Sequence, residues 1–133
     1  MYKRQVTSFA SGCLYCQAHT ILGAERFGST KKRLDEVWNY ANSSAFSKAE
    51  KAALDFAFAA ASVPNKVKEK EVFQLKNYWD EYDIVEIMGV IALFGFLNRW
   101  NDSMGSALED LPIEKGKEHL TKNTNWTIGK HRV

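Results

Sequence analysis

Two cysteines and one histidine lie close together near the start of the chain, between Ser11 and Thr20. Two cysteines separated by two residues can close a disulfide with little backbone movement. On a helix Cys13, Cys16 and His19 would share one face, because intervals of three residues drift by only about 60° per step. A histidine in that position can take a proton from a thiol. The segment therefore predicts thiol–disulfide chemistry, with both thiols and a base in one short stretch.

The residues before and between the cysteines favour a reactive thiolate. Gly12 is a natural break before a helix that we expect to run from about Cys13 to Phe27. Free N–H groups and the dipole at the start of a helix stabilise a thiolate, which is the reactive species. Tyr15, between the thiols, could donate a hydrogen bond to a sulfur or to a peroxide oxygen, although such a tyrosine more often only packs.

Of three other interpretations of the cysteine pair, core filling and a zinc site stay open at this point. Two cysteines on an apolar helix face can simply fill a core. A structural zinc site needs four protein ligands, and the remaining histidines, His119 and His131, are far away in the sequence, with no second paired cluster. A thioredoxin-like site would need a βαβ context, which the sequence does not show. We therefore expect no metal and no organic cofactor.

Composition and charge exclude several classes of function. The chain has 133 residues, 45% of them hydrophobic and 26% charged, which is typical of one globular domain over 1–133. The net charge of +2 without a basic cluster argues against nucleic-acid binding. The longest apolar run, Ile84 to Leu97, is too short for a bilayer and contains Glu86, so we expect no membrane partner. Without a visible secretory signal, a cytoplasmic location is predicted.

Helical periodicity dominates the chain, and no stretch alternates long enough to predict a sheet, so the expected fold class is all-α. Ser47 and Glu50 form a capping box ahead of a helix that Pro64 ends. The long apolar helix is apolar nearly all round, which is typical of a central helix or of one buried in an interface. At its end Asn98, Arg99 and Asp102 are interpreted as a polar cap or subunit contact rather than as catalytic residues. This long helix is expected over about 82–104, with Asp80 or Asp83 as its cap, and two other helices are expected over about 31–41 and 67–78.

Three separated motifs resemble the carboxymuconolactone decarboxylase/alkylhydroperoxidase D-like superfamily, particularly its peroxidase-related branch. The first is the Cys13–Cys16 pair itself. The second is the apolar stretch Glu86–Asp102, which is similar to the long family helix that ends in an Asn-Arg pair, here Asn98-Arg99. The third is the late segment Trp126–His131, similar to the family's closing Trp…Gly-Lys-His. The three motifs occur in the right order and span most of the chain.

The resemblance implies an alkylhydroperoxidase D-like helical bundle that assembles into homo-oligomers, namely dimers, trimers or hexamers. It implies a cysteine pair that reduces a hydroperoxide and is re-reduced by a dithiol protein or a small dithiol. Carried over, Cys16 is the attacking thiol, Cys13 the resolving thiol that faces the reductant, and His19 part of the proton relay. The decarboxylase branch lacks the cysteine pair, so lactone decarboxylation is not expected here.

The chain departs from the family pattern at two positions. The family histidine stands four residues after the second cysteine, where this chain has Thr20, one residue beyond His19. The family glutamate stands twelve residues before the first cysteine, where this chain has Met1. We therefore expect that a family segment normally precedes this sequence. The rival functions are a non-catalytic scaffold or redox sensor of the same fold, and a lyase or isomerase acting on a small organic acid.

Overall fold

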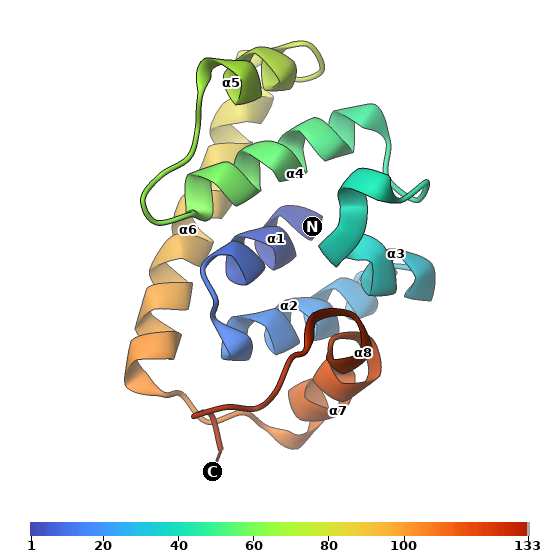
Figure 1. Cartoon of the computed structure of the whole chain (residues 1–133), viewed down its shortest axis with the longest axis vertical. Coiled ribbons are helices and arrows are strands. Elements are labelled where there is room, and N and C mark those ends of the chain that lie inside the picture. Colours follow the sequence, from blue (N-terminus) through green and yellow to red (C-terminus); the bar gives the residue numbers. More distant parts are fainter. Residues whose placement is uncertain (133) are drawn as a thin grey trace.

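The computed structural model describes residues 1–132 and contains only helices among them, which confirms the all-α prediction (Figure 1). No helix in that range has the length and apolar character needed to cross a membrane. In chain order the helices are α1 (Tyr2–Ala10), α2 (Leu14–Arg26), α3 (Lys31–Glu36), the 3₁₀-helix η1 (Val37–Asn42), α4 (Lys48–Ala61), α5 (Glu69–Lys76), α6 (Glu81–Met104), α7 (Asp110–His119) and α8 (Thr121–Thr124).

Helix α1 lies at the centre of the molecule and packs against α2, α4 and α6 (Figure 1). One apolar cluster joins α1 to η1, α4, α5 and α6 through residues such as Val6, Leu54 and Ile87. A second cluster joins α2 to α3, α7 and the C-terminal segment, and it includes Ile21 and Trp126. The start of α2 is thus held from one side by α1 and α6 and from the other by α7 and the chain end.

Local signals predicted several helix boundaries correctly. The Ser47 side chain accepts from the Glu50 backbone N–H at 3.2 Å, and the Glu50 carboxylate accepts from the Ser47 N–H at 2.9 Å. This reciprocal pair satisfies two donors at the start of α4, as the capping box predicted. Asp80 caps α6 by accepting from the Asp83 N–H at 2.9 Å. The helix expected over 31–41 is instead divided into α3 and η1, with non-helical angles at Asn39.

Of the two positions expected for the apolar helix, the central one is wrong, because α6 is not buried on all sides within the single chain. Only Ile87, Ile91 and Asn98 of this helix are buried. The opposite face leaves Val85 at 70%, Phe96 at 61% and Trp100 at 58% exposure. Periodicity could not reveal the exposed face, because an apolar helix has the same sequence pattern whether its neighbours belong to its own chain or to another.

Candidate active site

Cys13 is the N-cap of α2, and this position explains why the two thiols meet. Gly12 adopts a positive φ of 73° between α1 and α2, a conformation that glycine accepts without strain. Cys13 then has extended angles, and its Sγ accepts from the Cys16 backbone N–H at 3.2 Å. The sulfur therefore replaces the oxygen that a serine or aspartate usually offers at a helix start. The expected helix start at Cys13 is confirmed, and both thiols are free.

The two thiols have different electrostatic surroundings. Hydrogen bonding from the Cys16 thiol, followed by that from the Cys16 backbone N–H, lowers the pKa of Cys13 although burial opposes this. The same thiol–thiol hydrogen bond raises the pKa of Cys16, and burial and the nearby Cys13 charge add to it. A single negative charge on the pair thus rests first on Cys13, where the helix N-terminus supports it.

The two thiols also differ in their access to the cavity, and here Cys16 and not Cys13 is favoured. A cavity of about 190 Å³ lies between α1, α2 and α6, and Cys16 forms part of its wall. Cys13 is fully buried and does not line this cavity. The cavity wall is largely apolar or aromatic, with one arginine, one histidine, one threonine and one carboxamide. Its side chains include Arg4, Tyr15, His19, Thr20, Phe94, Leu97 and Asn101. A small apolar molecule would therefore meet Cys16 and not Cys13.

Tyr15 and His19 both line this cavity, beside Cys16. Their rings stack with centroids 4.3 Å apart. The His19 Nε2 lies 3.0 Å from a Glu109 carboxylate oxygen, an ion-pair distance when the ring is protonated. No described contact joins a His19 nitrogen to the Cys16 sulfur, so its place in a proton relay stays a prediction. The structure does bring Cys13, Cys16, Tyr15 and His19 into one site.

Sequence reasoning missed a polar group from the end of α6. Asn101 lies on the cavity wall with its Nδ2 3.9 Å from the Cys16 Sγ. Asp102 follows it, and its negative charge acts to raise the pKa of both thiols. The polar residues that end the apolar helix were a signal for this region, but they were interpreted as a helix cap.

The C-terminal segment also reaches the site. His131 is fully buried, its ring centroid is 5.7 Å from that of Tyr15, and its Nδ1 lies 2.8 Å from the Ser106 carbonyl oxygen. Trp126 donates from Nε1 to the Leu14 carbonyl oxygen at 2.9 Å, next to Cys13. The late Trp…His motif therefore packs against the start of α2, over 100 residues away in sequence.

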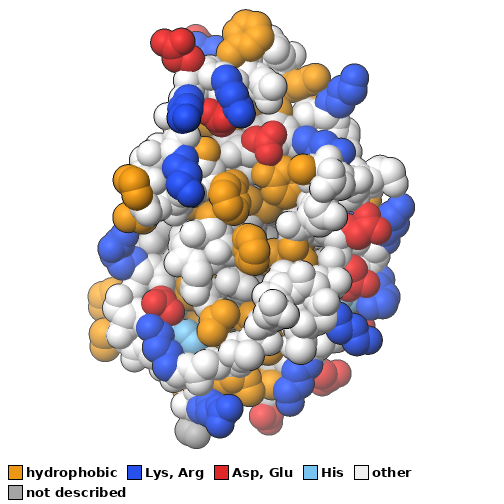
Figure 2. Space-filling model, in the orientation of Figure 1, with side chains coloured by type: hydrophobic (Ala, Val, Ile, Leu, Met, Phe, Trp, Pro, Cys, Tyr) orange, Lys and Arg blue, Asp and Glu red, His pale blue; other side chains and the backbone are white. Residues whose placement is uncertain are grey.

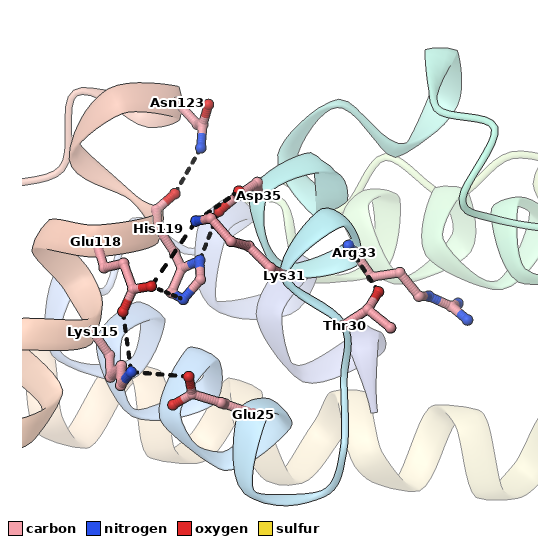
Figure 3. Close-up of polar contacts among 9 residues, drawn as sticks. All are labelled: Glu25, Thr30, Lys31, Arg33, Asp35, Lys115, Glu118, His119 and Asn123. Carbon is pink, nitrogen blue, oxygen red and sulfur yellow. Dashed lines mark hydrogen bonds and ion pairs between the residues drawn. The ribbon is translucent and has the colours of Figure 1, made fainter.

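The other buried histidine, His119, belongs to a polar network between α2, α3 and α7 (Figure 3). Its Nδ1 lies 2.6 Å from an Asp35 oxygen. Among residues 1–132, the single group of three metal-type ligands is Glu25, Glu118 and His119. The Lys115 ammonium lies 2.9 Å and 3.0 Å from these two carboxylates and already forms an ion pair with each. No Cys₂His₂ group forms around the thiols in this range.

The sequence matches no protein-family profile and no curated protein. Solved structures do match. This chain is similar to a debrominase. The apo crystal structure of the debrominase Bmp8 is 33% identical, with a TM-score of 0.85 over 88% of this chain. A Bmp8 variant with one cysteine replaced by alanine, in complex with 2,3,4-tribromopyrrole, is 32% identical with the same TM-score. The chain spans 63% of the length of Bmp8, less than two thirds.

Proposed function

We propose that this chain is a dithiol oxidoreductase that reduces a hydroperoxide in the cavity in front of Cys16. The observation that carries the proposal is the placement of the pair at the start of α2, where Cys16 lines the cavity and Cys13 caps the helix behind it. A dithiol so placed can deliver two electrons without a metal or organic cofactor.

In the proposed reaction, the Cys16 thiolate attacks the outer oxygen of the hydroperoxide, and the O–O bond breaks. The products are a sulfenic acid on Cys16 and an alkoxide, which takes one proton to become an alcohol. The Cys13 thiolate then attacks the Cys16 sulfur, so that a disulfide forms and the hydroxyl leaves as water with a second proton. An external dithiol restores both thiols by exchange. His19, in contact with Glu109, is the group we assign to the proton of the leaving alkoxide.

Reductive debromination of an aromatic compound is the second candidate, because a similar structure is a debrominase that has been captured with 2,3,4-tribromopyrrole. The same two electrons would replace bromine by hydrogen: one aryl bromide and two thiols give the arene, a disulfide, a proton and bromide. Tyr15, Phe94 and Leu97 give the cavity an aromatic and apolar wall suited to such a ring.

The two candidates can be separated with the full chain and dithiothreitol as reductant. We expect repeated consumption of tert-butyl hydroperoxide, and the loss of this activity in Cys16→Ser. Release of bromide from 2,3,4-tribromopyrrole without consumption of peroxide would replace the first candidate by the second. If neither substrate turns over, the dithiol enzyme is contradicted in favour of a scaffold or redox sensor. Activity on a small organic acid that needs His19 but neither cysteine would indicate a lyase or isomerase.

A further inference from the structure

We propose that the Asn101 carboxamide donates a hydrogen bond to the Cys16 thiolate, and that Ser106 is the positioning residue that holds it in this orientation. The inference rests on the proposed function, since it concerns the thiol that meets the substrate. It concerns a different residue from the cysteine pair and its histidine, and it comes from the packing of α6 against α2.

The two hydrogens of the Asn101 amide have separate acceptors. Nδ2 donates one hydrogen to the Leu97 carbonyl oxygen at 2.9 Å, one turn earlier on α6. The acceptor of its second hydrogen is the Cys16 Sγ, which lies 3.9 Å from Nδ2. That distance is long for a neutral thiol. Hydrogen bonds shorten when the acceptor carries a full charge, and catalytic contacts often tighten in the reacting complex. Asn101 is thus ready to respond to charge on this sulfur.

Ser106 fixes which end of the carboxamide faces the thiol. Its hydroxyl donates to the Asn101 Oδ1 at 2.8 Å, so the oxygen is engaged and the NH₂ group points to the sulfur side. Ser106 is itself held on both sides. Its backbone N–H donates to the Asn101 carbonyl oxygen at 3.1 Å, and its own carbonyl oxygen is 2.8 Å from the Nδ1 of the buried His131. Gly105, with a φ of 61°, makes the turn that brings Ser106 back onto α6.

This donor matters because the other surroundings of Cys16 oppose a charge there. Cys13 and burial raise the pKa of Cys16, and Asp102 adds a negative charge. The Asn101 amide acts in the other direction. Other titratable groups that line the cavity or act on the thiols include the Met1 amino group, Arg4, Tyr15, His19 and Lys130. Glu109 faces His19 from the other side. For Cys16 to attack, the charge that rests first on Cys13 must move to Cys16, and Asn101 favours that transfer.

The test is a titration of Cys16 alone, in a Cys13→Ser background, by thiolate absorbance and by the pH dependence of iodoacetamide alkylation. Serine keeps the N-cap, so α2 retains its first turn. Replacing Asn101 by Ala should raise the Cys16 pKa by about one pH unit, as expected for the loss of one charge-assisted hydrogen bond. Ser106→Ala should shift it in the same direction by a smaller amount, because the amide remains but can rotate.

Asn98→Ala is the matched control, since Asn98 is a buried asparagine on the same helix without a described contact to either sulfur. Its Cys16 pKa should equal that of the background. If Asn101→Ala does not fold, as judged by circular dichroism, the Cys16 pKa of Ser106→Ala decides between the two outcomes. An unchanged Cys16 pKa in the folded Asn101 and Ser106 variants overturns the inference. Because no substrate is used, a pKa shift without peroxide turnover would keep this inference while contradicting the proposed function.

Discussion

The two thiols, although only three positions apart, differ in their surroundings. Cys13 caps α2 and holds charge most readily, whereas Cys16 lines the cavity. We expect a sulfenic acid on Cys16 when Cys13→Ser meets one equivalent of hydroperoxide, because the resolving thiol is absent. Trapping with dimedone and peptide mass spectrometry would locate it. A dimedone adduct on Cys13 in the Cys16→Ser variant would reverse the roles of the two thiols.

The residues of the site were predictable only where their signal is local. Cys13, Cys16 and His19 fall within one turn or two of the same helix, and Gly12 marks its start. Asn101 reaches Cys16, and His131 reaches Tyr15, only through packing between segments that are 85 or more residues apart. Nothing in the spacing of a single sequence specifies which end of α6 would lie against α2.

At the scale of single elements, two glycines in different helices should respond oppositely to the same substitution. A Cβ at Gly116 in α7 would lie 2.5 Å from the Trp126 ring, whereas nothing lies within 4 Å of one at Gly23 in α2. Gly116→Ala should therefore destabilise the fold by about 1–3 kcal/mol through overpacking. Gly23→Ala, the control, should stabilise it by up to about 1 kcal/mol through helix propensity. Urea unfolding measures both, and equal effects would contradict the packing of α7 on Trp126.

The polar network of α3 with α7 predicts a loss of stability in acid (Figure 3). Burial acts to raise the pKa of Asp35, but hydrogen bonds from His119 and Lys31 outweigh it and leave the pKa below its ordinary 3.8. A carboxyl with a lowered folded pKa stabilises the fold above its unfolded pKa, and this contribution disappears as the pH falls through the folded value. Wild type should therefore exceed Asp35→Asn in urea midpoint at pH 7.

The difference in urea midpoint between wild type and Asp35→Asn should disappear below pH 3.8, where Asp35 becomes protonated. Glu114→Gln, an exposed carboxylate of α7 without a described ion pair, is the control and should change little at either pH. A gap between wild type and Asp35→Asn that persists unchanged in acid would show that the carboxylate charge contributes nothing to the α3–α7 contact.

Helix boundaries were the most predictable elements, because caps act over three or four residues. The Ser47 capping box was predicted from the sequence, and Asp80 was one of two candidate caps for α6. The division of 31–42 into α3 and η1 was not predicted, since no Pro or Gly in this range marks the kink at Asn39. For α6 the sequence left a central helix and an interface helix as alternatives, because composition alone does not say what covers an apolar face.

At the scale of the whole molecule, α6 leaves an apolar face that this chain does not cover. In Figure 2 hydrophobic side chains (orange) are exposed at the left edge of the molecule, where α6 lies in Figure 1. Beside it an open groove of about 690 Å³ is lined in part by Met88, Phe96 and Trp100. Exposed apolar surface of this kind marks interaction sites. We expect a homo-oligomer formed through α6, as light scattering would measure.

Phe96→Arg should shift the protein toward the monomer, because a charge on the contact face must be desolvated. Phe27→Arg is the matched control. Phe27 is 71% exposed but lies at the end of α2, so this variant should keep the oligomer of the wild type. A wild-type protein that scatters as a monomer at all concentrations would contradict self-association through α6.

A thiol count after one equivalent of organic hydroperoxide tests most directly whether Cys13 and Cys16 form a redox couple. We expect the fully reduced chain to lose both thiols rapidly and its intact mass to fall by two hydrogen atoms, with both thiols returning once a dithiol is added. Thiols that stay free, or that oxidise only as slowly as an unactivated cysteine, would contradict the assignment of this pair as a peroxide-reducing dithiol.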